Sequence, residues 1–80
     1  MAKAPTVQSL DRTFDILEVL GSSQEGRTLA MITDDLKLPK STVHRLLSVL
    51  ISREYVRKND ETGRYQLGPG FISLSANYLN

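Results

Sequence analysis

Apolar residues recur at helical spacing near the start of the chain. They form a stripe that consists of Leu10, Phe14 and Leu17. Ser9 is suited to cap this helix, and Gly21-Ser22-Ser23 ends it. Ile16 and Val19 fall outside the stripe, while acidic residues gather on another side: Asp11, Asp15 and Glu18. We therefore expect a second apolar surface, covered by another helix or by a partner chain.

Two further helical patterns follow, joined by a short turn. Thr28 is suited to cap a helix that ends at about Leu36, with Leu29, Ile32 and Leu36 facing inward. Pro39 occupies the expected first position of the next helix, where its missing N–H costs nothing. That third helix has an apolar stripe of Val43, Leu46, Leu47 and Leu50. Its opposite face is polar and carries Ser41, Arg45, Ser48 and Ser52, flanked by Thr42 and His44.

After Glu54 the hydrophobic period changes from 3.6 to 2, which is typical of strands. The pattern predicts a β-hairpin with strands at 55–59 and 64–67 and a turn in which Gly63 takes a positive φ. Tyr55 and Tyr65 are expected to cover the core rather than to stack on bases. Gly68-Pro69-Gly70 interrupts the chain before a last helix, which is apolar on more than one side.

This order of elements predicts a mainly α fold with a small β-hairpin, the winged helix-turn-helix. We expect a flexible arm at residues 1–8 and the winged helix-turn-helix domain at 9–67. Residues 68–80 would begin a connector helix toward a further domain absent from this chain. No internal repeat or low-complexity segment is evident.

The formal net charge is only +1, but the charge is unevenly distributed. Residues 1–36 hold three basic and six acidic side chains, whereas residues 37–67 hold seven basic and three acidic ones. A domain polarised in this way has one face suited to a polyanion. Chance clustering of surface charge is the alternative.

Duplex DNA is the partner that this arrangement favours. In a helix-turn-helix the N-terminal part of the second helix of the pair enters the major groove. We expect DNA contacts there from Lys40, Ser41, Thr42, His44 and Arg45, and along the backbone or minor groove from the hairpin residues Arg57, Lys58 and Arg64. Each basic residue also has a simpler interpretation as a solvated surface charge, and His44 as an ordinary flank position.

Other kinds of site find little support. The chain has no cysteine and one histidine, so we predict no metal and no other cofactor. Ser41 and His44 lack an activating carboxylate at a useful spacing, so an enzyme is not expected. No signal peptide and no apolar run of about 20 residues is present, which favours a cytoplasmic protein without a membrane partner.

One stretch carries a family resemblance. Residues 38–47, with the sequence LPKSTVHRLL, and residues 63–69, with GRYQLGP, make the chain resemble the N-terminal DNA-binding domain of the IclR family of bacterial transcription regulators. The opening SLDR at 9–12 and Ile16-Leu17 also resemble the family's first helix. The family typically has glycine at the two positions that Lys37 and Glu54 occupy in this chain. The angle between the second and third helices, or the orientation of the wing, would therefore differ slightly here.

The resemblance implies binding to palindromic half-sites as a homodimer, and a C-terminal domain that senses a small-molecule effector. It also implies pairing through the first and connector helices, which agrees with spare apolar residues at Ile16, Val19, Ile72 and Leu79. We therefore expect sequence-specific binding of double-stranded DNA. The alternative from another class is a winged helix that binds proteins and not DNA, and single-stranded nucleic acid is disfavoured because no exposed aromatic platform stands out.

Overall fold

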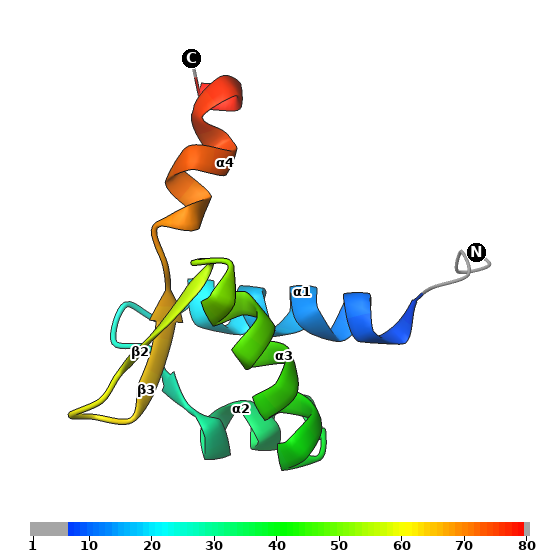
Figure 1. The fold of residues 1–80 in the computed structure, drawn as a ribbon. Coiled ribbons are helices and arrows are strands. Elements are labelled where there is room, and N and C mark those ends of the chain that lie inside the picture. Colours follow the sequence, from blue (N-terminus) through cyan, green and yellow to red (C-terminus); the bar gives the residue numbers. More distant parts are fainter. Residues whose placement is uncertain (1–6, 80) are drawn as a thin grey trace.

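Residues 7–79, which the computed structural model describes, form four helices and three short strands (Figure 1). The elements in chain order are α1 (Gln8–Gly21), β1 (Arg27–Thr28), α2 (Leu29–Leu36), α3 (Lys40–Ser52), β2 (Val56–Asn59), β3 (Arg64–Leu67) and α4 (Gly70–Leu79). Helices α2 and α3 form the helix-turn-helix, and β2 and β3 form the predicted hairpin. The fold class expected from the sequence is confirmed.

The start of α1 differs from the prediction. The carbonyl of Val7 accepts hydrogen bonds from the N–H groups of Leu10 and Asp11, both at 3.0 Å, and no side chain within residues 7–79 caps the helix. Ser9 lies inside the first turn, where its carbonyl accepts from the Thr13 hydroxyl at 2.7 Å. The prediction that Ser9 is the cap is therefore wrong. Of the predicted arm, residues 1–6 lie outside the described range and Gln8 is already helical.

The starts of α2 and α3 follow the prediction closely. The Thr28 hydroxyl accepts from the N–H of Met31 at 3.2 Å, which confirms the cap of α2. Pro39 has an extended backbone, with φ −60° and ψ 143°, so it precedes α3 as the cap residue rather than occupying its first helical position. The difference is one residue, because the fixed φ of proline suits both positions.

The sequence pattern did not predict the third strand. The sheet is antiparallel in the order β1-β3-β2, with Arg27 opposite Tyr65 and Thr28 opposite Arg64. A segment of two residues shows no alternation, so only its pairing with a strand far along the chain defines it. The strand fixes the start of α2 to the wing, here meaning residues 56–67 of β2, β3 and their turn.

The turn of the wing forms as predicted. Gly63 has φ 72°, and its N–H donates to the carbonyl of Asn59 at 2.8 Å. The Asn59 side-chain oxygen accepts from the N–H groups of Glu61 and Thr62 at 2.9 and 3.3 Å. Three hydrogen bonds to one residue therefore hold the turn in a defined conformation.

The core lies where α1, α2, α3 and the sheet meet. Its fully or nearly buried side chains are Ile16, Leu20, Ile32, Val43, Leu47, Leu50, Val56 and Tyr65. They include Val43, Leu47 and Leu50 of the predicted apolar stripe of α3, whereas its fourth member, Leu46, is only partly buried. They also confirm that Tyr65 is a core residue. For α1 the prediction is reversed, because Ile16 and Leu20 are buried and Leu10 and Phe14 are exposed.

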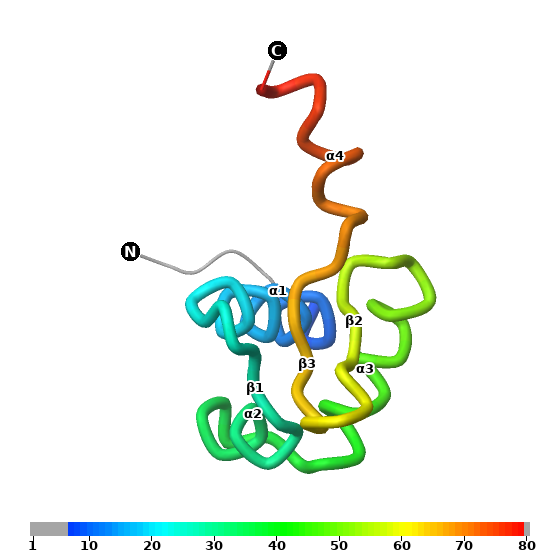
Figure 2. Tube along the Cα trace, turned by 90° about the vertical axis from the view of Figure 1, so that its left-hand side faces the viewer, coloured from blue at the N-terminus to red at the C-terminus, as the bar shows by residue number. Residues whose placement is uncertain are grey.

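Helix α4 extends away from the rest of the domain (Figures 1 and 2). Its beginning is attached to the turn between α3 and β2: the N–H of Gly70 donates to the Glu54 carbonyl and that of Gly68 to the Tyr55 carbonyl, both at 2.8 Å. The Phe71 and Tyr55 rings meet edge to face, with centroids 4.9 Å apart. Beyond this attachment, most of the large apolar side chains of α4 are exposed. No helix among the described residues has both the length and the apolar character needed to span a membrane.

Candidate nucleic-acid interface

The turn between α2 and α3 sets the position of the candidate reading helix. Lys37 ends α2 in the left-handed conformation, with φ 55° and ψ 43°, and the N–H of Leu38 donates to the Thr33 carbonyl at 3.3 Å. Glycine is the usual residue in this conformation because a Cβ atom strains it. The chain keeps the sharp turn with lysine and places one more positive charge beside the start of α3.

The N-terminal half of α3 presents a polar, basic face. Lys40, Ser41, His44 and Arg45 are exposed, and Thr42 is half-buried. Among residues 7–79, no hydrogen bond or ion pair engages the side chains of Lys40, His44 or Arg45. The donors of these side chains are therefore available to an external partner.

The first turn of α3 adds backbone donors to this face. Pro39 offers no capping side chain, and no other side chain caps the helix. The leading N–H groups of a helix, together with the positive end of its dipole, favour an anion such as a phosphate. The described part of α3 carries no acidic residue that would compete.

The turn of the wing lies at the same end of the molecule as the start of α3. Both views place them at the end opposite α4, with the wing projecting to one side of the helix pair (Figures 1 and 2). A partner that spans this end would meet α3 and the wing together. The connector helix leaves in the opposite direction and stays clear of such a partner.

The three basic residues predicted on the wing are not equivalent. Arg57 is exposed and lines a shallow pocket of about 230 Å³ beside the C-terminal end of α1, together with Leu20 and Gln66. The Lys58 Nζ lies 5.5 Å from the centroid of the Tyr65 ring, on the face of the wing opposite to Arg57. Arg57 is thus at the base of the wing, and Lys58 lies over an aromatic face.

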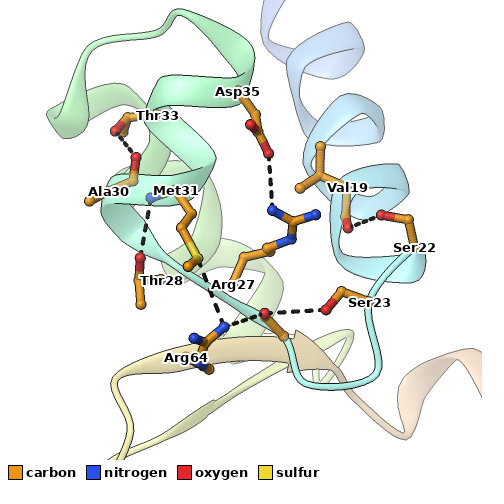
Figure 3. A network of polar contacts seen from close by, with 11 residues as sticks. Val19, Ser22, Ser23, Arg27, Thr28, Ala30, Met31, Thr33, Asp35 and Arg64 are labelled. Atoms are coloured by element: carbon orange, nitrogen blue, oxygen red, sulfur yellow. Dashed lines mark hydrogen bonds and ion pairs between the residues drawn. The ribbon is translucent and has the colours of Figure 1, made fainter.

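Arg64 and Arg27 are engaged by the protein itself (Figure 3). The Arg64 Nη1 donates to the Gly26 carbonyl at 3.0 Å and lies 3.8 Å from the Met31 sulfur. The Arg27 Nη1 lies 3.5 Å from a carboxylate oxygen of Asp35. Arg64 therefore joins β3 to the loop before β1. Its contact with DNA remains a prediction, and its hydrogen bond to Gly26 shows a structural role that the sequence did not reveal.

The turn of the wing is acidic. Asp60 and Glu61 are exposed, and the hydrogen bonds to Asn59 hold the backbone that presents them. Carboxylates at this position repel phosphates. The end of the wing is consequently less suited to the DNA backbone than the count of its basic residues indicates.

An apolar groove lies on another side of the domain, between α1, the end of α3 and the start of α4. It has a volume of about 410 Å³, and its apolar lining comes mainly from Leu10, Phe14, Leu17, Val49, Leu50, Tyr55, Phe71 and Leu74. Phe14 is 56% exposed. The groove shares no residue with the polar face of α3.

The four residues predicted at a dimer interface fall into different environments. Ile16 is 0% exposed inside the core, so it offers no surface to a partner and that prediction is wrong. Val19 is half-buried and packs against the core. Ile72 and Leu79 are 74% and 75% exposed on α4, and for them the interface remains a prediction.

Sequence reasoning missed the exposed strip of Leu10 and Phe14 and the contribution of Val49. The apolar residues of α1 span a wide arc of the helix, and the acidic residues lie on the side opposite the middle of that arc. The middle of the arc, at Ile16 and Leu20, is the part that the core covers. The position of the acids was the available signal.

Comparison with known proteins identifies similar chains. The family model described as "IclR helix-turn-helix domain" matches residues 9–60. The "Glycerol operon regulatory protein" of Streptomyces coelicolor is 35% identical over 77 residues, which cover 96% of this chain and 30% of that protein. The "HTH-type transcriptional repressor AllR" of Escherichia coli strain K12 is 33% identical over 73 residues, covering 91% of this chain and 27% of that protein.

Solved structures agree with these relatives. An IclR transcriptional regulator from Alicyclobacillus acidocaldarius matches with a TM-score of 0.82 and 32% identity, over 92% of this chain and 30% of that one. The Agobacterium tumefaciens repressor BlcR matches with a TM-score of 0.82 and 30% identity, over 95% of this chain and 30% of that one. The chain spans about 30% of the length of the first two curated relatives.

Proposed function

Because the chain belongs to the IclR helix-turn-helix family of DNA-binding transcription regulators, we propose that it reads duplex DNA sequence-specifically with α3 in the major groove. The single observation that carries this proposal is the face of α3 that bears Lys40, His44 and Arg45, whose side chains have no polar partner among residues 7–79. A major groove is about 12 Å wide and accepts one α-helix. Lys40, Ser41, Thr42, His44 and Arg45 are the proposed contacts.

The wing supplies a smaller part of the proposed interface. Arg57 and Lys58 are exposed, and their charges are suited to phosphates near the groove. Arg64 is half-buried and bonded to Gly26, so we assign it first to holding the wing against β1 and only then to DNA. Asp60 and Glu61 argue against a close approach of the turn itself to the backbone.

We also propose that the DNA-bound form is a homodimer. The apolar groove and the exposed apolar residues of α4 form a surface that a single domain leaves uncovered, including Phe14, Ile72 and Leu79. Two copies related by a two-fold axis would present two α3 helices to palindromic half-sites, about 34–36 Å apart for sites separated by one helical turn. Val19 packs against the core and does not line this groove, so its contact with a partner copy stays a prediction.

The rest of the regulator lies outside this chain. Since the matched relatives are more than three times as long, we propose that α4 connects to a C-terminal domain that binds a small-molecule effector. Residues 9–67 would then be the DNA-binding domain and residues 68–80 the connector. A regulator of this kind acts on bacterial DNA, which places it in the cytoplasm.

A salt titration tests DNA binding. The affinity of the chain for a labelled random-sequence duplex is measured at several salt concentrations, and log affinity is plotted against log salt. Three to five phosphate contacts at about 0.9 each predict a slope between roughly −3 and −4.5. Arg12→Ala, on α1 and outside the groove, serves as the control and keeps this slope.

One outcome of the salt titration would contradict DNA binding. No binding at low salt and high protein concentration would contradict the DNA proposal and favour a winged helix that binds proteins.

A sedimentation experiment tests the dimer. Phe14→Lys is expected to shift the DNA-bound species from two copies toward one, because it places a charge in the apolar groove.

A further inference from the structure

The polar side chains of α3 are limited to cationic groups, hydroxyls and one imidazole. Its thirteen residues, KSTVHRLLSVLIS, include no aspartate, glutamate, asparagine or glutamine. The exposed polar side chains of its first three turns are Lys40, Ser41, His44, Arg45 and Ser48. This helix therefore lacks the amide and carboxylate groups that other reading helices use.

That restriction limits which bases the helix can recognise directly. In the major groove, asparagine or glutamine pairs with adenine through both donor and acceptor, and aspartate or glutamate accepts from the amino group of cytosine. Arginine or lysine donates to the O6 and N7 acceptors of guanine. Because α3 has no amide or carboxylate, the strongest direct contact available to it is that of arginine or lysine with guanine.

Arg45 has the best position for that contact. It follows Ser41 by four residues and precedes Ser48 by three, so both small side chains lie beside it on the same face. The Ser48 hydroxyl donates back to the His44 carbonyl at 2.9 Å and stays close to the helix. Small neighbours let the helix approach the floor of the groove, while the guanidinium extends beyond them.

Lys40 is less suited to this role. It is the first residue of α3, where the helix N-terminus favours a phosphate, and its ammonium group is a point charge on a flexible chain. A guanidinium presents a planar pair of donors that matches the two acceptors of guanine. We therefore expect Lys40 to contact a phosphate of the DNA backbone and Arg45 to contact a base edge.

We propose that Arg45 is the specificity-determining residue and that it selects a guanine in each half-site through O6 and N7. This inference rests on the proposed function, since it requires α3 to enter the major groove. It goes beyond that function by naming the base and the residue that selects it. Because α3 has no amide or carboxylate, the adenine and cytosine positions of the site are selected weakly or through DNA deformability.

The test is a selection of binding duplexes from a randomised pool with the wild-type chain, Arg45→Ala and Arg12→Ala. The wild type is expected to enrich a guanine at one position of each half-site. Arg45→Ala loses that preference and retains the others. Arg12→Ala, the same substitution on α1 and outside the proposed interfaces, leaves the base preference unchanged.

A modified base tests whether Arg45 contacts the N7 atom of the guanine. Replacing the selected guanine by 7-deazaguanine removes the N7 acceptor and leaves Watson–Crick pairing intact. Wild-type affinity is expected to fall, within the range of about 5- to 150-fold that a complete bidentate pair contributes. The affinity of Arg45→Ala should then be the same for both duplexes, because the partner of N7 is already gone.

The outcomes separate the two proposals. Specific binding without an enriched guanine, or with a guanine that survives Arg45→Ala, overturns the role of Arg45 and leaves DNA binding intact. The absence of any duplex binding at low salt overturns the proposed function, and this inference with it. Enrichment that disappears only in Arg45→Ala, together with loss of the 7-deazaguanine effect, supports both.

Discussion

The start of α3 and the wing carry similar numbers of basic residues but use them differently. Lys40 and Arg45 on α3 have no partner among the described residues, whereas Arg64 on the wing donates to the Gly26 carbonyl and Lys58 lies over the Tyr65 ring. The wing also ends in two carboxylates, while α3 contains none. A basic residue is therefore informative about DNA only after its protein contacts are known.

This contrast predicts that one arginine controls binding and another controls stability. Arg45→Ala is expected to lower the affinity for a selected duplex by about 1–3 kcal/mol, because it removes a contact to a base edge. Its free energy of unfolding should stay within about 0.5 kcal/mol of wild type, since the side chain is exposed and unpartnered. Equilibrium binding and urea denaturation measure the two quantities. An Arg45→Ala chain that binds normally would remove the distinction between the two regions.

Arg64→Ala should show the reverse pattern. The substitution breaks the hydrogen bond to Gly26 and is expected to lower the free energy of unfolding by about 1 kcal/mol in urea denaturation. Arg57→Ala is the matched control on the neighbouring strand, and it should change stability by less than about 0.5 kcal/mol. Equal stability of the two variants would mean that the bond to Gly26 contributes nothing net.

Substitutions at the two residues with a left-handed backbone test the turns that precede α3 and the wing. Lys37 precedes α3 and Glu54 precedes the wing, with φ 55° and 67°. Lys37→Gly and Glu54→Gly should each raise the free energy of unfolding by about 0.5–1 kcal/mol, because relief of backbone strain exceeds the entropy cost of glycine. Lys37→Ala retains the Cβ atom and should give no such gain in thermal or urea denaturation. If the alanine variant is stabilised equally, backbone strain is not the cause.

The smallest expected effect concerns the acidic turn of the wing. Glu61→Gln removes one negative charge and should raise the affinity for any duplex on the order of twofold, with the gain disappearing as salt increases. Asp11→Asn on α1 provides an exposed acid outside the proposed interface, and it should change affinity less. A Glu61→Gln gain that persists at high salt would contradict simple repulsion of phosphates.

Much of the fold follows from local patterns in the sequence. The period of Val43, Leu47 and Leu50 predicts the buried face of α3, and Thr28 and Gly63 mark a helix start and a turn. These features depend on neighbours within a few residues. The preference for glycine at Lys37 and Glu54 in the family also agrees with the positive φ that both residues adopt.

The features that could not be predicted depend on distant contacts. Strand β1 has two residues and exists through pairing with β3, and the bond from Arg64 to Gly26 spans 38 positions. The burial of Ile16 in place of Leu10 depends on which part of a wide apolar arc meets α2, α3 and the sheet. Candidate DNA contacts on α3 were accessible from the sequence, whereas the structural role of Arg64 was not.

The most direct test of the proposed interface is an NMR titration, in which duplex DNA is added to the isotope-labelled chain and the changes in its amide chemical shifts are recorded. We expect the largest changes from Lys40 to Arg45, smaller changes at Arg57 and Lys58, and little change at Asp60 and Glu61. The Arg12→Ala variant should give the same map. Changes concentrated on the wing turn, or on the groove around Phe14 and Leu74 without any at α3, would contradict the central claim that the start of α3 reads the DNA.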